Sequence, residues 1–135
     1  MSQENIEAFK RSSEAFNSRD VEAALEELDP EVEWHPRMAK LVGGEATVSR
    51  GHEGVREMLR DLEEAFDEIH GEFAEIRDLG DRLLAIGRLR NRGKGSGAEV
   101  ESPVAYVVEF KNRKAIRVRT YLDPKEALEA AGLQE

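Results

Sequence analysis

Trp34 and His35 stand side by side at the end of a short alternating segment, in a chain of 135 residues with one Trp and three His. An imidazole with an unperturbed pKa of about 6.5 suits proton abstraction near neutral pH, so His35 is the candidate catalytic base. An aromatic wall beside such a group is typical of a small-molecule cleft. Strand alternation leaves a second interpretation open: if Trp34 points into a cavity, His35 points away from it unless the chain bends.

Two later segments carry arginine or tyrosine at every second position, and the two sets are Arg88, Arg90 and Arg92, and Arg117, Arg119 and Tyr121. Residues two apart share one face of a strand, so each set lies on a single face. On a concave face, Arg88 and Arg119 would clamp a carboxylate, phosphate or enolate. On a convex face, the arginines would be solvated or would pair with glutamates of the neighbouring strand.

The remaining candidate ligand contacts are aromatic. Phe16 is expected to line a pocket between the first helix and the sheet, and Trp34 lies either in the pocket wall or in the core beside it. Tyr106 and Tyr121 each offer a hydroxyl donor to a carbonyl oxygen, although a strand tyrosine is more often packed with its hydroxyl at the sheet edge. Gly87 alternates with the arginines of its strand, and its small size indicates room for a ligand.

Several other kinds of site are excluded by composition or spacing. The chain has no cysteine, which excludes a thiol nucleophile, a disulfide and a thiolate metal site. The histidines are far apart, and Arg56 follows His52 where a zinc protease needs its second His. The glycine-rich stretch at 93–97 lacks the spacing of a phosphate loop. We therefore expect neither a metal nor a cofactor.

Hydrophobic periodicity predicts the helices that position these residues. Apolar stripes at helical spacing run over about 3–17, 20–28 and 52–67. The first stripe consists of Ile6, Phe9, Ser13 and Phe16. Asp20 is a suitable cap for the second helix. Asp123 followed by Pro124 predicts the start of a fourth, short helix that stops at Gly132.

A short strand is predicted at 31–35, after Asp29-Pro30 has ended the second helix. A loop follows over 36–50, and four further strands are predicted at 69–78, 82–92, 98–110 and 114–122. No helix separates these four strands, so they form antiparallel hairpins. The prediction is one α+β domain over 1–135, in which a curved, cone-shaped antiparallel sheet packs against three helices of the first half and a short C-terminal helix follows.

The charge of the chain limits its partners. The formal net charge is −9, which argues against nonspecific binding to nucleic acid. No apolar run approaches the roughly 20 residues of a membrane span, and the polar, acidic N-terminus is unlike a signal peptide. We expect a cytoplasmic protein with neither a nucleic-acid nor a membrane partner.

The segment at 98–110 is apolar on both faces. Val104, Tyr106, Val108 and Phe110 alternate with Ala105 and Val107. An antiparallel strand with one solvated face should alternate apolar with polar residues. Since the helices cover one face of the sheet, we expect a second subunit to cover the other, in a homodimer packed sheet to sheet.

Four segments, in this order and spacing, resemble the SnoaL-like (polyketide cyclase-like) proteins of the nuclear transport factor 2-like superfamily: 14–20 (EAFNSRD), 29–35 (DPEVEWH), 50–55 (RGHEGV) and 118–123 (VRTYLD). The resemblance extends over essentially the whole chain. It implies a cone-shaped half-barrel with a deep apolar pocket, usually dimeric. Relatives include polyketide cyclases, ketosteroid isomerases, limonene epoxide hydrolases and scytalone dehydratases, and others bind ligands without catalysis, so the fold does not fix the reaction.

The sequence departs from the ketosteroid isomerases at two points. Where they have a catalytic carboxylate before a proline, this chain has His35-Pro36, and its first helix has no tyrosine. The leading hypothesis is a protein that binds a small hydrophobic or aromatic ligand, as a cofactor-free cyclase or isomerase in which His35 takes a proton next to a carbonyl and Tyr106, Tyr121 or an arginine stabilises the enolate. The alternative is a noncatalytic ligand-binding or dimeric interaction module.

Overall fold

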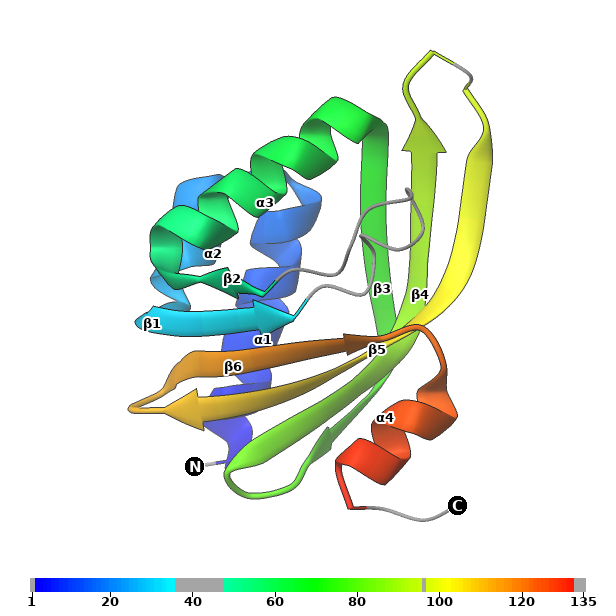
Figure 1. Cartoon of the computed structure of the whole chain (residues 1–135). Helices are drawn as coiled ribbons and strands as arrows, with labels where there is room; N and C mark the ends of the chain where they lie inside the picture. The colour runs from blue at the N-terminus through cyan, green and yellow to red at the C-terminus, as the bar shows by residue number, and fades with distance from the viewer. Residues whose placement is uncertain (1, 36–47, 96, 133–135) are drawn as a thin grey trace.

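The chain folds into one curved sheet with three helices on one face and a fourth helix on the other (Figure 1). The structure is a computed structural model that describes residues 2–35, 48–95 and 97–132. Its helices are α1 (Ser2–Asn17), α2 (Val21–Glu26), α3 (Gly51–Ala65) and α4 (Pro124–Ala130). All four lie close to the predicted positions, which confirms the helical part of the sequence interpretation.

The described strands form a sheet in the order β2-β1-β6-β5-β4-β3. They are β1 (Leu28–His35), β2 (Ser49–Arg50), β3 (Phe66–Asp78), β4 (Arg82–Gly93), β5 (Glu99–Lys111) and β6 (Lys114–Tyr121). Strands β3 to β6 are antiparallel neighbours, as predicted. Strand β1 runs parallel to β6, which gives the sheet one parallel pair. Residues 36–47 of the predicted loop lie outside the described residues. The predicted α+β fold is confirmed.

Two predicted caps are present, and one predicted boundary is wrong. The Asp20 carboxylate accepts a hydrogen bond from the Ala23 N–H at 3.2 Å, and the Asp123 carboxylate accepts one from the Lys125 N–H at 2.9 Å. Helix α2, however, ends at Glu26, and Asp29-Pro30 lies inside β1. The register of β1 against β6 shifts between Leu28 and Glu33, and a proline without an N–H is tolerated at such an irregularity.

Gly87 lies where two strands come closest. It pairs with Phe73 of β3, whose register against β4 shifts between Phe73 and Glu75. A Cβ atom at Gly87 would overlap the Glu72 carbonyl oxygen and lie 2.8 Å from the Phe73 Cα. A bulge of this kind bends a strand, and glycine permits the close approach of the two backbones. The space that the sequence assigned to a ligand at Gly87 is therefore filled by the backbone of β3.

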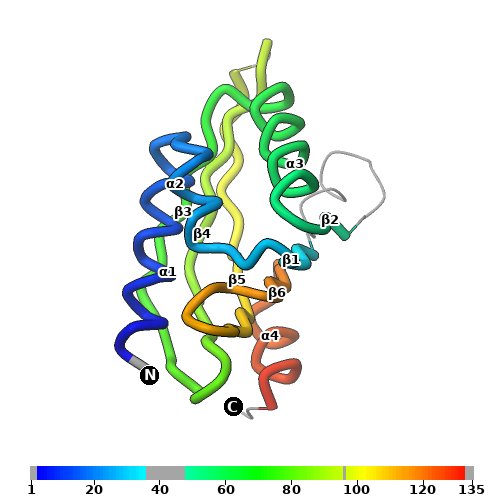
Figure 2. Tube along the Cα trace, turned by 90° about the vertical axis from the view of Figure 1, so that its left-hand side faces the viewer, coloured from blue at the N-terminus to red at the C-terminus, as the bar shows by residue number. Residues whose placement is uncertain are grey.

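The helices cover the face of the sheet that we call the inner face, defined by Leu83, Ala85, Val108 and Val118. Leu25 of α2 and Val55 and Leu59 of α3 complete its buried core. Helix α1 lies alongside β3, as both views show (Figure 2). The helices and the inner face therefore surround the space in which a pocket was predicted.

Helix α4 packs on the opposite, outer face of the sheet. Its buried side chains Ala127 and Leu128 form one cluster with Leu84, Ala105 and Val107. The second apolar face of β5 is thus covered by the C-terminal helix of the same chain. Because α4 already covers this face, the apolar pattern of β5 does not by itself require a second subunit. The sequence interpretation did not anticipate where α4 packs.

Candidate functional site

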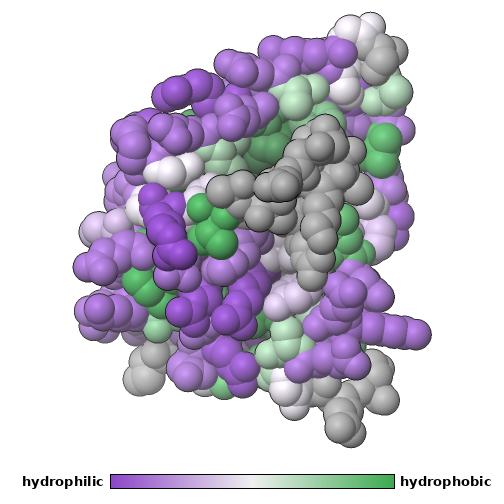
Figure 3. Space-filling model, in the orientation of Figure 1, coloured by the Kyte–Doolittle hydropathy of each residue, from purple (hydrophilic) through white to green (hydrophobic). Residues whose placement is uncertain are grey.

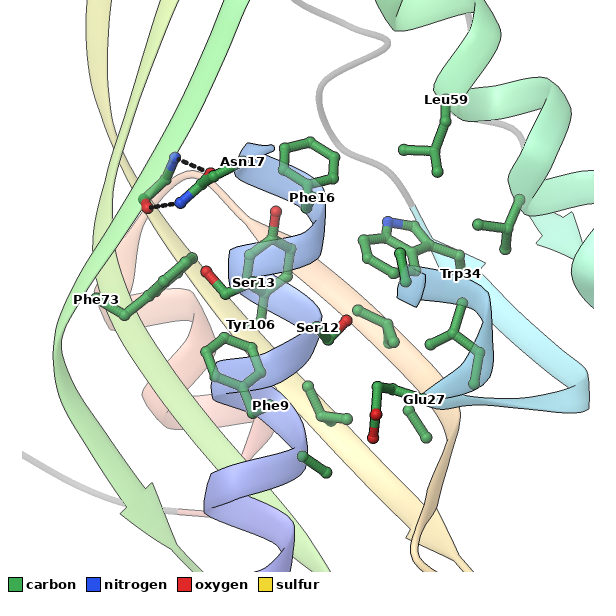
Figure 4. Close-up of a pocket in the computed structure, with 18 of the residues that line it drawn as sticks. Phe9, Ser12, Ser13, Phe16, Asn17, Glu27, Trp34, Leu59, Phe73 and Tyr106 are labelled. Carbon is green, nitrogen blue, oxygen red and sulfur yellow. Dashed lines mark hydrogen bonds between the residues drawn. The ribbon is translucent and has the colours of Figure 1, made fainter. Parts of the chain in front are cut away.

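A cavity lies between α1, the α2–β1 junction, α3 and the inner face of the sheet. It contains about 750 Å³ of space not filled by atoms, part of which is open to solvent. Six aromatic side chains from four different elements line it, and these are Phe9, Phe16, Trp34, Phe73, Tyr106 and Phe110. Figure 4 labels the first five of them. Its polar lining residues are Ser12, Ser13, Asn17 and Glu27. A concave, mainly apolar site with a few polar groups is the usual form of a small-molecule site.

The aromatic rings contact one another around Tyr106. Its ring centroid lies 6.1 Å from that of Trp34 in an edge-to-face arrangement, and 5.5 Å from that of Phe73. Phe9 meets Phe73 edge to face at 5.1 Å. Such offset and edge contacts are the favourable geometries for aromatic pairs. The rings therefore fix each other in position and form a preorganised wall.

The Tyr106 hydroxyl is the most unusual polar group of this wall. Burial raises the pKa of Tyr106 to about 12. Tyr106 is half-buried, and within the described residues its hydroxyl has no hydrogen-bonding partner. The hydroxyl is not among the fully buried polar atoms, so it borders the cavity and not the closed core. In Figure 4 it points toward the part of the cavity where Phe16 and Asn17 lie. The hydroxyl is therefore a protonated donor available to a ligand oxygen.

The raised pKa of Tyr106 predicts a loss of stability in alkali. The folded protein favours the neutral phenol, so the stabilisation is complete below the unfolded pKa of about 10 and is lost as pH rises toward 12. At pH 11 the loss should be about 1.4 kcal/mol, because one pKa unit corresponds to about that free energy. Urea unfolding of the wild type and of Tyr106→Phe at pH 8 and pH 11 measures it. Equal pH dependence in both proteins would show that the phenol titrates normally.

The other polar lining groups fall into two classes. Asn17 and Gly71 of β3 exchange two hydrogen bonds of 2.9 Å, amide to carbonyl in each direction, which fastens the end of α1 to the sheet. Both Glu27 carboxylate oxygens accept hydrogen bonds from Arg11, each at 3.1 Å. The hydroxyls of Ser12 and Ser13 have no such partner within the described residues. Together with Tyr106, they leave three hydroxyl groups free to bind a ligand or water.

The structure does not bring His35 into the cavity. Residues alternate along β1, so Trp34 faces the cavity and His35 faces the outer side of the sheet, as one sequence interpretation foresaw. His35 Nε2 lies 3.5 Å from a carboxylate oxygen of Glu33, which shares its face. A hydrogen bond from Arg50 lowers the pKa of Glu33. His35 therefore belongs to a charged cluster outside the described cavity lining.

Three further predicted contacts, Arg88, Arg119 and Tyr121, also lie on the outer face. Arg88 is exposed and donates a hydrogen bond to the Glu101 carboxylate at 2.8 Å. The geometry therefore supports the alternative in which these arginines lie on the convex face and pair with glutamates of the neighbouring strand. Arg119 lies opposite His35 and Val107. Tyr121 packs against the cluster beneath α4. None of these three lines the described cavity.

Three predicted contacts, Phe16, Trp34 and Tyr106, line the cavity together. The sequence interpretation did not assign Phe9, Ser12, Asn17 or Phe73 to the site. One signal was available: Ser13 interrupts the apolar stripe of α1 between Phe9 and Phe16, and a hydroxyl on an apolar stripe indicates a hollow rather than a packed core. Nothing in the β3 sequence distinguishes Phe73 from a core residue.

Within the described residues, no three His, Cys, Asp or Glu side chains are grouped so that they could hold a metal ion. No helix in this part of the chain has the length and apolar character needed to cross a membrane.

Comparison with known proteins gives a family and a fold. The sequence profile described as SnoaL-like domain matches residues 9–118. No curated protein sequence matches significantly.

Similar solved structures include a protein of unknown function from Burkholderia pseudomallei, described as nuclear transport factor 2-like, with 25% identity, a TM-score of 0.80 and coverage of 93% of this chain and 95% of that one. TerC, co-crystallised with polyporic acid, has 25% identity and a TM-score of 0.79 over 96% of this chain and 98% of its own. A candidate polyketide cyclase from Xanthomonas campestris shares the fold, with 17% identity and a TM-score of 0.73 over 96% and 98% of the two chains.

Proposed function

Since this chain belongs to the SnoaL-like domain family, we propose that it binds a small apolar molecule that carries an aromatic ring and an oxygen acceptor. The observation that carries the proposal is the Tyr106 hydroxyl, which lies within an aromatic wall without a protein partner among the described residues. A bound carbonyl oxygen would supply the missing acceptor while the rings enclose the rest of the ligand. The similarity to TerC, which was co-crystallised with polyporic acid, agrees with this class of ligand.

Binding without catalysis is the better supported form of this proposal. Proton transfer next to a carbonyl requires a base at the ligand. Of the described residues, Glu27 is the carboxylate that lines the cavity, and Arg11 occupies both of its oxygens. His35 faces the other side of the sheet. A cofactor-free cyclase or isomerase would therefore have to release Glu27 from Arg11 before this carboxylate could accept a proton.

Acetophenone and ethylbenzene test the proposed donor, because they share a ring and differ in the carbonyl oxygen. We expect the wild type to bind both compounds. The Tyr106→Phe substitution should lower the affinity for acetophenone about fivefold and leave the affinity for ethylbenzene unchanged, since a neutral hydrogen bond contributes about 1 kcal/mol. Isothermal titration measures the affinities. Quenching of Trp34, the single tryptophan, reports acetophenone inside the cavity. Failure of the wild type to bind either compound would refute the proposal.

A homodimer through the outer face is a separate proposal. Beyond α4 this face presents arginines of β4 beside glutamates of β3 and β5, such as Arg88 with Glu101 and Arg90 with Glu68 at 3.9 Å. A surface with both charges at alternating positions can pair with a second copy of itself. Sedimentation at micromolar concentration should then show a dimer that Arg88→Glu converts into a folded monomer. A monomeric wild type would remove this proposal.

A further inference from the structure

A second, smaller cavity adjoins the first. It contains about 410 Å³ of space not filled by atoms, part of it open to solvent, and lies between the end of α1, α2, α3 and β3. Phe16, Ala24 and Leu59 line both cavities. These three side chains therefore form a common wall, from which a ligand in the aromatic cavity could extend into the second one.

The second cavity is lined by apolar side chains that are incompletely packed. Val21, Leu62 and Ile69 contribute one side chain from each of α2, α3 and β3, and all three are only half-buried. On the face shown in Figure 3, hydrophilic side chains cover α3, and hydrophobic ones are visible between α3 and the long strands. Burying such surface against an apolar group is favourable by about 25 cal/mol per Å².

Charged residues of the second cavity lie at its solvent side. Arg19 and Asp20 come from the turn between α1 and α2, and Glu63 comes from α3. Arg19, which has a positive φ of 61°, donates a hydrogen bond to the Asp67 carbonyl at the start of β3. Arg19 thus links the turn after α1 to β3, and Asp20 caps α2, while Val21, Leu62 and Ile69 keep the interior of the cavity apolar. A charged group would thus be disfavoured inside, and an alkyl chain would be accepted.

We propose that the second cavity is a subsite for an unbranched alkyl chain attached to the ring-bearing ligand of the first cavity. The inference rests on the proposed function. The Tyr106 hydroxyl points toward Phe16, so a ketone held by this hydroxyl directs its alkyl substituent to the common wall (Figure 4). To enter the second cavity, the ligand would have to displace the side chains of Phe16, Ala24 and Leu59, and a chain of single methylene width does so at less cost than a fused ring.

Phenyl ketones of increasing length, from acetophenone through butyrophenone and hexanophenone to octanophenone, test the subsite by isothermal titration. In the wild type we expect affinity to rise roughly fourfold with each methylene that is buried. Val21→Phe and Ile69→Phe fill the second cavity from two different elements. Both should bind acetophenone like the wild type and lose most of the gain for octanophenone, and thermal unfolding checks that each variant is folded.

Each outcome has a distinct meaning. If acetophenone binds the wild type and the longer ketones bind no better, the alkyl subsite is refuted while the proposed function stands. If the gain with length persists in both folded variants, the chain lies elsewhere, and the subsite is again refuted. If no ketone binds the wild type, the proposed function fails and the subsite fails with it. A wild-type series without a gain refutes the subsite even if a variant does not fold, and one folded variant of the two is enough to test a gain that is present.

Discussion

Ser13→Phe is expected to weaken acetophenone binding by at least about 100-fold without unfolding the protein. Ser13 lies on α1 and lines the aromatic cavity between Phe9 and Phe16 in sequence. A phenyl ring at this position would occupy the space that the ligand ring needs, so that the two cannot be present together. The new ring gains apolar contacts, which offsets the strain of tighter packing, and the free energy of unfolding should change by less than about 2 kcal/mol.

Glu14→Phe is the matched control for this substitution. It places the same ring one residue further along α1, on the exposed side of the helix. Its affinity for acetophenone should equal that of the wild type. Isothermal titration and urea unfolding of the three proteins separate a blocked cavity from a damaged fold. Wild-type affinity in a folded Ser13→Phe protein would show that the ligand does not occupy this cavity.

The periodic patterns predicted the elements because burial of one face dictates residue spacing. The first three helices follow from this rule, whereas the fourth helix was predicted from its Asp123-Pro124 start and the four long strands also from the turns between them. Periodicity does not, however, say which face of a strand is the inner one. The sequence correctly predicted that the arginines of β4 share one face of the sheet. Only the packing of helices α1 to α3 on the opposite face shows that the arginines lie on the outer face.

The candidate site illustrates the same limit at single residues. Trp34 and His35 are neighbours, yet strand alternation puts one into the aromatic cavity and the other beside Glu33 on the outer face. Phe73 lines the cavity next to the bulge of β3, and this bulge forms where the backbone of β3 closely approaches Gly87 of β4. Long-range contacts of this kind leave no periodic trace, so the aromatic wall could be predicted only in part.

Gly87→Ala is expected to lower the free energy of unfolding by about 3 kcal/mol, in the range of severe overpacking. The added Cβ would overlap the Glu72 carbonyl oxygen and lie 2.8 Å from the Phe73 Cα, and both are backbone atoms. Relief requires β3 to move away from β4, which breaks hydrogen bonds of the ladder. Because Phe73 lines the aromatic cavity, its displacement should also weaken acetophenone binding.

Gly71→Ala, in the neighbouring strand, provides the control for Gly87→Ala. A Cβ at Gly71 would lie 3.2 Å from Leu89 Cδ2 and 3.2 Å from Phe73 Cε2, which are side-chain atoms that can shift. Its cost in urea unfolding should therefore stay below about 1 kcal/mol. Equal stability of the two variants would mean that β3 does not approach Gly87 closely. In that case the bend that turns Phe73 toward Tyr106 would need another cause, because no other glycine of β4 lies opposite the bulge.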